Sequence, residues 1–187
     1  MQFSIQREDL LKPLQLVVGV VERKQTMPVL SNVLFVIDDQ QLSITGTDTE
    51  VELIGRTTLN EAADDGEITI PARKLFDIAR ALPDGAQLKF DLAGDRISLH
   101  AGRSRFTLST LPAGDFPATE DLEVQISVNL QESALRELIE RTSFAMAQQD
   151  VRFYLNGLLF DLDEKQLRCV ATDGHRMALC EAPLQHE

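Results

Sequence analysis

The chain has 187 residues, of which 43% are hydrophobic and 26% charged, and a formal net charge of −12. These proportions are ordinary for a soluble globular protein of one or two domains. No basic region leads into an apolar run at the N-terminus, and no stretch approaches the roughly 20 apolar residues of a membrane helix. The sequence thus argues against a secreted or membrane-spanning protein, and we expect a cytoplasmic one.

The chemistry-bearing residue types are sparse. The two cysteines, Cys169 and Cys180, are not arranged as CxxC, and the three histidines are scattered along the chain. In a protein without a secretion signal, such cysteines are expected to remain reduced thiols. We therefore expect no disulfide, no metal site and no cofactor.

The first 109 residues predict two rounds of the same pattern. The first round begins with a strand at 2–5 and an apolar helix over 7–23 that contains Pro13, where we expect a kink or a 3₁₀ turn. Strands follow at 32–37, 42–45 and 51–57. The second round has a strand at 67–70, a helix over 74–82 just after Pro71, and strands at 87–92, 96–100 and 103–109. One domain is thus two βαβββ units, and residues 111–120 form a linker.

A third round starts with a strand at 124–130 and a helix over 132–147, and it repeats the first. Shifting the chain by 125 positions places Phe3–Thr49 on Val128–Gly174 without a gap. Ten pairs are identical, including Phe35/Phe160, Thr47/Thr172 and Asp48/Asp173, and other pairs keep their polarity. Such a period indicates tandem copies of one structural unit. The second copy stops after one βαβββ unit, so we expect a fragment of a longer protein.

The negative charge is unevenly distributed. The segments 7–24, 71–82 and 131–147, which contain the predicted helices, carry nine basic and seven acidic residues, a net charge of +2, so the rest of the chain carries −14. This pattern suits helices that face a polyanion, although mixed charges on soluble helices are an equally good explanation.

The corner Thr172-Asp173-Gly174-His175-Arg176 combines a hydroxyl, a carboxylate, an imidazole and a guanidinium within five residues. Asp173 and His175 could act as an acid–base pair, but a nucleophile and an oxyanion site are also needed, and spacing supplies neither. The first copy has Thr47-Asp48 at the matching place, which favours a shared structural turn. The remaining possibility is a binding site.

Four motifs resemble one family, the bacterial sliding clamp or β subunit of DNA polymerase III. They are IPARKLFDIARALPDGA, GRSRFTLSTLPAGDFP, MAQQDVRFYLNG and VATDGHRMAL, and the resemblance covers essentially the whole chain. It implies an α+β fold of tandem DNA-clamp domains, each built of two βαβββ units with helices on one face of antiparallel sheets. Residues 1–120 would be the first clamp domain and 121–187 the first half of a second, incomplete one, with a third domain absent.

The resemblance also implies a function and partners. Two full-length protomers would join head to tail as a homodimer ring around duplex DNA, bound independently of its sequence. The ring would be a processivity factor for DNA replication without chemistry of its own. It would bind the polymerase III α subunit, the clamp loader and other proteins that carry the clamp-binding motif. The fragment itself is not expected to close a ring or to contact membranes. The alternatives are a small hydrolase using Asp173 and His175, or a free-standing peptide-binding module.

Three sets of site residues follow from the resemblance. The expected DNA-contacting residues are Lys24, Arg73, Arg80, Gln149, Phe153 and Tyr154. Half of a peptide-binding pocket is expected at Leu155, Thr172, Gly174, His175, Arg176 and Met177. The expected dimer interface is Lys74, Arg96, Arg103, Arg105, Phe106 and Leu108. Ordinary exposed loop residues, a solvated basic helix and a charged, protected sheet edge are the respective structural alternatives.

Overall fold

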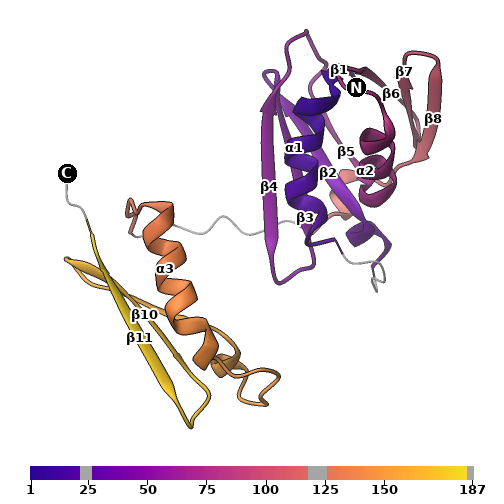
Figure 1. Cartoon of the computed structure of the whole chain (residues 1–187). Helices are drawn as coiled ribbons and strands as arrows, with labels where there is room; N and C mark the ends of the chain where they lie inside the picture. Colours follow the sequence, from indigo (N-terminus) through magenta and orange to yellow (C-terminus); the bar gives the residue numbers. More distant parts are fainter. Residues whose placement is uncertain (22–26, 118–125, 185–187) are drawn as a thin grey trace. The chain divides into compact units, whose positions relative to one another are not determined.

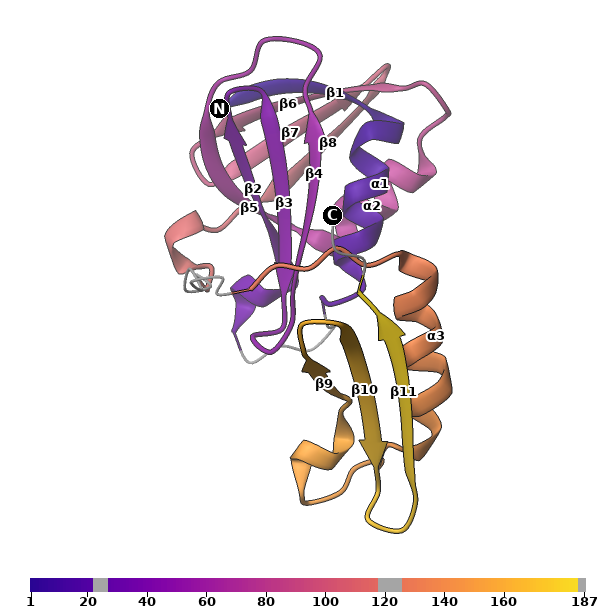
Figure 2. The same cartoon turned by 90° about the vertical axis from the view of Figure 1, so that its left-hand side faces the viewer.

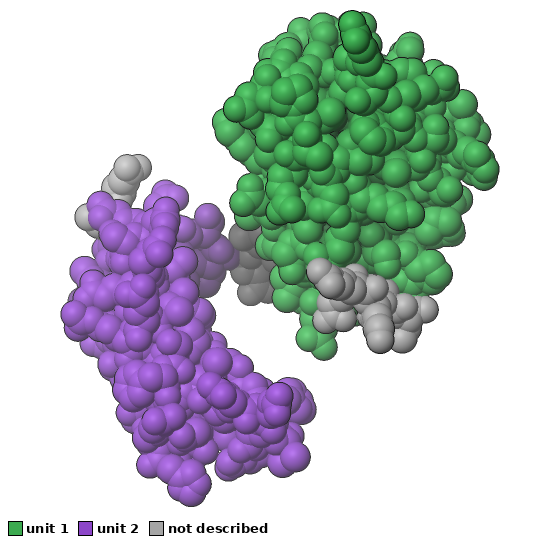
Figure 3. Space-filling model, turned by 45° about the vertical axis from the view of Figure 1, so that its right-hand side comes forward, with its two compact units in different colours: residues 1–120 green, residues 121–187 purple. Residues whose placement is uncertain are grey.

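A computed structural model describes residues 1–21, 27–117 and 126–184 (Figure 1). The chain divides into two compact units, residues 1–120 and residues 121–187 (Figure 3). Each unit is described separately below. Within the described residues, no helix is both long and apolar enough to cross a membrane.

Over residues 1–21 and 27–117, unit 1 contains two four-stranded antiparallel sheets and two helices (Figures 1 and 2). One sheet has the order β1-β6-β7-β8 and the other the order β4-β3-β2-β5. The elements are β1 (Gln2–Gln6), α1 (Arg7–Val18), a 3₁₀ turn η1 (Pro28–Ser31), β2 (Asn32–Asp38), β3 (Gln41–Thr47), β4 (Glu52–Thr58), β5 (Gly66–Pro71), α2 (Ala72–Ala81), β6 (Gln87–Ala93), β7 (Arg96–Ala101), β8 (Ser104–Ser109) and the 3₁₀ turn η2 (Ala113–Asp115). These are the two βαβββ units that the sequence predicts.

The core of unit 1 is formed by side chains of both sheets and both helices. Phe3 and Phe90 come from one sheet and stack with ring centroids 4.5 Å apart, while Phe35 from the other sheet lies 6.4 Å from each of them. The alternation of apolar and polar residues along the strands directs these side chains inward. Helix α1 packs on β3 and β4 and against α2.

Two equivalent strand pairs join the two βαβββ units within unit 1. β1 pairs with β6 so that Phe3 lies opposite Phe90, and β5 pairs with β2 so that Ile68 lies opposite Phe35. The two strand pairs are equivalent. Each residue of β1 corresponds to the residue 65 positions later in β5, and each residue of β2 corresponds to the residue 55 positions later in β6. Each unit thus gives its first strand to the sheet of the other, as in a two-fold relation.

Helix α1 is continuous across Pro13, and the sheet accommodates it with glycine. A Cβ added to Gly55 on β4 would lie 2.6 Å from the Pro13 Cβ, and one on Gly46 would lie 2.9 Å from the carbonyl oxygen of Val17. Contacts below 3.0 Å require something to move, so only glycine permits this close approach. The helix ends at Val18, five residues earlier than the apolar pattern predicts.

In its described residues, 126–184, unit 2 contains one helix packed on one three-stranded antiparallel sheet of order β11-β10-β9. Its elements are α3 (Glu132–Thr142), the 3₁₀ turns η3 (Ser143–Ala145) and η4 (Phe153–Asn156), β9 (Leu159–Leu162), β10 (Gln166–Thr172) and β11 (Met177–Pro183). The shift of 125 places η1 on η4, β3 on β10 and β4 on β11, residue for residue. The repeat therefore extends through the last strand.

Two predictions for unit 2 are wrong. Residues 126–130 are described but form no strand, because no neighbouring strand supplies hydrogen bonds to them. In unit 1 the matching strand β1 is stabilised by β6. The predicted helix over 132–147 ends at Thr142 and continues as a 3₁₀ turn, since the Thr142 hydroxyl bonds back to the carbonyl of Leu138 at 2.7 Å.

Candidate functional site

The corner between β10 and β11 is held by its own side chains. The Thr172 hydroxyl donates to the carbonyl of Arg176 at 2.7 Å and accepts from the backbone N–H of Gly174 at 3.0 Å. Asp173 Oδ1 accepts the backbone N–H groups of His175 and Arg176, both at 2.9 Å. Gly174 has φ +89°, a conformation that favours glycine. The sequence Thr-Asp-Gly thus specifies this turn.

Unit 1 builds the same corner between β3 and β4. Thr47 and Asp48 make the equivalent four hydrogen bonds, and Thr49 has φ +81° where unit 2 has Gly174. In both corners the backbone N–H donors stabilise the ionised carboxylate and lower the pKa of Asp48 and of Asp173. The Thr-Asp pair is therefore structural in both copies.

The geometry does not support an acid–base pair at this corner. Asp173 Oδ1 is occupied by two backbone donors, and Oδ2 accepts from Arg176 Nε at 2.9 Å. Among the described residues no hydrogen bond joins the Asp173 carboxylate to the exposed His175 ring. In this structure Asp173 thus holds the turn and does not position the His175 ring.

Arg152 lies against the corner and was missed at the sequence level. A Cβ added to Gly174 would lie 3.4 Å from both terminal nitrogens of Arg152. Asp150 fixes this guanidinium by two bonds, from Nε at 3.0 Å and from Nη2 at 2.8 Å. The same contacts lower the pKa of Asp150 to about 2. Because Gly174 has no side chain, the guanidinium of Arg152 has room beside the turn.

Leu155 is connected to this cation through η4. Arg152 directly precedes η4, and its carbonyl accepts the backbone N–H of Leu155 at 2.9 Å. The carbonyl of Leu155 in turn accepts the backbone N–H of Ala147 at 3.0 Å. The turn η4 therefore carries Leu155 next to the residue that contacts Gly174.

Exposed apolar side chains occur beside these polar groups. The guanidinium of Arg176 lies 5.8 Å from the ring centroid of Phe144, a further residue that sequence reasoning missed. Phe144, Met177 and Leu179 are all more than half exposed. Apolar surface next to a few oriented polar groups is the composition of peptide-binding sites. An isolated phenylalanine carries no pattern from which its place could have been predicted.

The other expected DNA contacts of unit 2 lie on the loop before η4 and on η4 itself. Gln149 is exposed with φ +57°. Phe153 and Tyr154 are mostly exposed and meet edge to face with centroids 6.2 Å apart. The Asn156 amide closes the loop by bonding the backbone N–H and carbonyl of Asp150 at 2.9 and 3.0 Å. These side chains are held outward on an ordered loop.

In unit 1, Arg73 and Arg80 share one face of α2 because seven residues make almost two helical turns. Both are exposed, but Arg73 Nη2 donates to the carbonyl of Val21 at 2.7 Å, and Arg80 lies 5.7 Å from the Phe76 ring centroid. Lys24 lies outside the described residues. The helices as observed carry a net charge of +1, with +2 on α2, so the remainder of the chain carries −13.

The expected interface residues lie at one sheet edge and on a helix. Strand β8 is the edge strand next to β7, and Arg105 on it and Arg96 on β7 are exposed. Arg103 lies in the turn before β8 instead of on the strand, and Lys74 is exposed on α2. Leu108 is buried in the core of unit 1 and Phe106 packs against that core. The edge therefore offers its backbone and charged side chains, whereas its apolar side chains already have partners.

Comparison with known proteins places this architecture in a family. The family model described as DNA polymerase III beta subunit, N-terminal domain, matches residues 1–120. The model for the central domain of the same subunit matches residues 129–187. The chain belongs to the DNA polymerase III beta subunit family.

Curated relatives are similar along the whole chain. A "Beta sliding clamp" of Pseudomonas putida is 61% identical over 189 residues, covering 100% of this chain and 52% of that protein. The Escherichia coli K12 protein of that name is 49% identical, covering 98% and 50%. The chain thus spans about half the length of the curated relatives it matches.

Solved structures agree with this assignment. The DNA polymerase III subunit beta of Pseudomonas aeruginosa superposes with a TM-score of 0.95 at 59% identity, covering 99% of this chain and 50% of that one. A sliding clamp of the same organism bound to griselimycin gives 0.94 at 59% identity, with the same coverage. The α+β clamp fold is therefore established.

Proposed function

We propose that this chain is the N-terminal part of a sliding clamp, which encloses duplex DNA and holds a replicative polymerase on it without chemistry of its own. Uninterrupted similarity to beta sliding clamps across both units carries the proposal. A protein that slides along DNA must contact it independently of the base sequence. Arginine side chains on a helix meet that need because they bind phosphates.

The first experiment tests the phosphate contacts. The Arg73→Ala and Arg80→Ala variants should weaken binding of the chain to duplex DNA at low salt, equally for unrelated sequences. Each lost contact should reduce the slope of log K against log salt concentration by about 1. Arg56→Ala, which removes an exposed arginine from strand β4, is the matched control. Loss of affinity in the control alone would contradict the proposed contact face.

Retention on DNA tests enclosure. Phosphate contacts alone weaken steeply with salt, so at physiological ionic strength we expect the chain to leave nicked circular and linear DNA equally. Retention on the circle and loss from the linear form would mean that these 187 residues close a ring by themselves. That result would contradict the proposal that they are one part of the ring.

We also propose that the β10–β11 corner and η4 form one wall of a pocket for clamp-binding peptides. The support is the arrangement of Arg152 beside Gly174, with Leu155 on η4 and Met177 exposed at the start of β11. A relative that is 59% identical is bound to griselimycin, which makes this compound the probe. One wall encloses a ligand poorly, so affinity should be weak.

Griselimycin titration with amide NMR tests the wall. We expect shifts confined to residues 152–155 and 172–177, and weaker binding of Met177→Ala. The unit 1 corner provides the control, since Val51→Ala lies at the position matching Arg176 and should bind as the parent chain does. Equal shifts at both corners would show that the ligand binds the turn shared by the two units and not the residues particular to unit 2.

For the proposed ring, the exposed edge of β8 in unit 1 is the surface we assign to a neighbouring protomer. An unpaired antiparallel edge can accept a further strand through its backbone groups. Arg96, Arg103 and Arg105 are exposed around it and would favour an acidic partner surface.

A further inference from the structure

The two cysteines of the chain lie directly opposite each other in unit 2. Both are free thiols, and the register of β10 on β11 makes Cys169 and Cys180 partners. Side chains opposite each other in an antiparallel pair lie on the same face of the sheet. This face carries α3, since both cysteines pack in one apolar cluster with Leu138 of that helix. The two sulfur atoms are thus neighbours under α3.

The backbone spacing of this pair suits a disulfide. Hydrogen-bonded and non-hydrogen-bonded pairs alternate along an antiparallel ladder. The backbone N–H of Leu184 donates to the carbonyl of Lys165 at 2.8 Å, and Cys169 and Cys180 lie four positions further along the same register. Because four is an even number, the cysteines form a hydrogen-bonded pair, in which the Cα atoms are about 5.5 Å apart. A disulfide spans that separation.

A disulfide at a hydrogen-bonded pair is strained and therefore easy to reduce. The Cβ atoms of opposite residues lie about 4.5–5.5 Å apart, with the larger values in hydrogen-bonded pairs, whereas a disulfide brings them to about 3.5–4.5 Å. The two strands must move locally to close this difference. Strained disulfides have more oxidising potentials than structural ones and are the labile ones. A cross-link here is suited to reversible formation.

The buried thiol also has a hydrogen bond that a cross-link removes. The Thr142 hydroxyl donates its hydrogen to the carbonyl of Leu138 at 2.7 Å, so in its 3.2 Å contact with Cys169 Sγ the thiol is the donor. Thr142 is fully buried and is the last residue of α3. A disulfide has no S–H group, so oxidation leaves this hydroxyl oxygen without its donor.

The end of α3 is connected to the β10–β11 corner. Thr142 directly precedes η3, which contains Phe144, and the Phe144 ring centroid lies 5.8 Å from the guanidinium of Arg176. The two cysteines are three residues from the last pair of that hairpin. A change at the sulfur atoms therefore reaches the corner both along the strands and through the end of α3.

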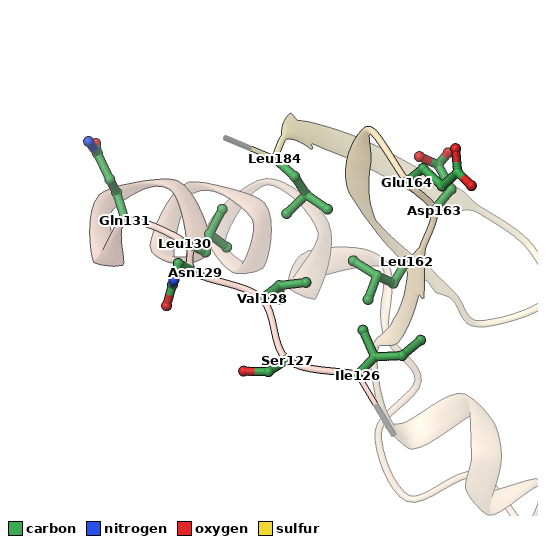
Figure 4. Close-up of a pocket in the computed structure, with 10 residues that line it drawn as sticks. All are labelled: Ile126, Ser127, Val128, Asn129, Leu130, Gln131, Leu162, Asp163, Glu164 and Leu184. Atoms are coloured by element: carbon green, nitrogen blue, oxygen red, sulfur yellow. The ribbon is translucent and has the colours of Figure 1, made fainter. Parts of the chain in front are cut away.

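The cysteine pair lies away from the β9 edge of the sheet. Ile126, Val128 and Leu162 are among the described residues that line a groove of about 830 Å³ at that edge, and neither cysteine lines it (Figure 4). In unit 1 the pair at the matching register likewise lies between β3 and β4, while the second βαβββ unit joins at β2. What covers the β9 edge thus leaves the alignment of the two cysteines unchanged.

We propose that Cys169 and Cys180 form a reversible cross-strand disulfide that responds to low-molecular-weight disulfides such as oxidised glutathione. The thiolate of Cys180, the less buried of the two, attacks one sulfur of oxidised glutathione and releases one reduced glutathione. Cys169 then attacks the Cys180 sulfur of the mixed disulfide and releases the second. Two protein thiols lose two hydrogen atoms and two electrons, and one glutathione disulfide becomes two thiols. The cross-link takes the donor from Thr142 and loosens the junction of α3 and η3.

Equilibration of the 187-residue chain in glutathione buffers, followed by alkylation and intact mass measurement, tests the cross-link. In excess oxidised glutathione both alkylation sites should be lost from the monomer without retained glutathione, and excess reduced glutathione should restore them. The control carries Leu179→Cys and Cys180→Ala, which moves one thiol to the opposite face of β11 and should give no internal disulfide. An uncross-linked parent chain, equal cross-linking of the control, or a disulfide that survives excess reduced glutathione overturns the proposal.

Amide NMR in the same buffers tests the effect on α3. The amide resonances of Thr142 and Phe144 should shift when the parent chain is oxidised and return when it is reduced. The Cys180→Ser variant keeps Cys169 and its bond to Thr142 but cannot cross-link, so its resonances at these residues should not change. A disulfide that forms without these shifts, or equal shifts in the Cys180→Ser variant, contradicts the proposed release of Thr142.

Discussion

The two units share one repeat but differ in how much of it they bury. Leu10 and Leu14 of α1 are fully buried, whereas their counterparts Leu135 and Ile139 on α3 are each 38% exposed. Both helices lie on three antiparallel strands of the same order and register. Unit 1 adds a second βαβββ unit whose helix and sheet cover the remaining face. The difference teaches that a residue pattern specifies the face of a helix, while the neighbouring unit determines whether that face is buried.

The units also differ in how closely the helix approaches its sheet. At the crossing, unit 1 has Gly46 and Gly55, while unit 2 has Ala171 and Cys180 at the matching positions. Leu138 of unit 2 replaces Pro13 and is itself buried. Unit 2 therefore has side chains at the two positions where the approach of α1 in unit 1 leaves no room for one.

The largest difference that we expect between the two units is in the rate of amide hydrogen exchange. Backbone amides of β9 and β10 should exchange at least about 100-fold faster than those of β2 and β3. The small cluster of Leu138, Leu167, Cys169 and Ala182 gives unit 2 little apolar burial to oppose local opening. Mass spectrometry after deuterium labelling measures both units in one sample. Equal exchange rates in the two units would contradict the expected difference in stability.

Paired truncations test the burial difference at equivalent positions. Leu14→Ala should destabilise unit 1 by about 2–5 kcal/mol, because it leaves a cavity in an enclosed core. Ile139→Ala should cost about 1 kcal/mol or less, since part of its surface is already in water. Urea unfolding followed separately in each unit gives both values. A larger cost for Ile139→Ala would mean that its exposed face is covered in solution.

Substitution at the crossing points tests the spacing. Gly55→Ala should destabilise unit 1 by about 1–3 kcal/mol, because the new methyl group would overlap the Pro13 ring. Cys180→Ala, at the matching position of unit 2, removes atoms without a clash and should cost less. Thermal unfolding of the two variants is the measurement. A stabilising Gly55→Ala would show that α1 can shift away from β4.

The smallest effect concerns ionisation at the loop before η4. Asp150 has its pKa lowered to about 2, mainly through Arg152, so its contribution to the ordered loop is present above the ordinary pKa near 4. That contribution is lost as pH falls through about 2. Arg152→Ala should return the Asp150 pKa toward 3.8, as measured by carboxyl NMR. Asp163 is the internal control, since backbone donors of Lys165 and Gln166 lower its pKa and the variant leaves them in place.

Most strands of unit 1 could be predicted from the sequence, because alternation and turn residues mark each of them. The charged sheet edge expected around Arg103 and Arg105 is found at β8, although only Arg105 lies on that strand. The strand at 126–130 could not be judged correctly, since a strand needs a partner and the sequence of one strand does not contain it. The ends of α1 and α3 were also missed: α1 ends in a turn after Val18, and α3 ends where the Thr142 hydroxyl bonds back to the carbonyl of Leu138.

At the candidate site, the shared Thr-Asp turn was predictable because the repeat placed Asp48 on Asp173. The contact of Arg152 with Gly174 was not, because it joins segments 22 residues apart through a guanidinium whose direction is set by Asp150. Likewise, nothing in the pattern around Phe144 announces that Arg176 lies over its ring. Sequence reasoning found the turn, and the structure supplied its neighbours.

The Thr-Asp corner has a consequence for how the two copies could diverge. Its hydrogen bonds come from the side chains of the first two residues and from the backbone, so the side chains at the third and fourth positions make none of them. Thr49 and Glu50 in one copy correspond to Gly174 and His175 in the other, on the same backbone path. A duplicated unit with such a corner can exchange its tip without refolding the hairpin beneath. One copy is then free to acquire a recognition surface while the other keeps a plain turn.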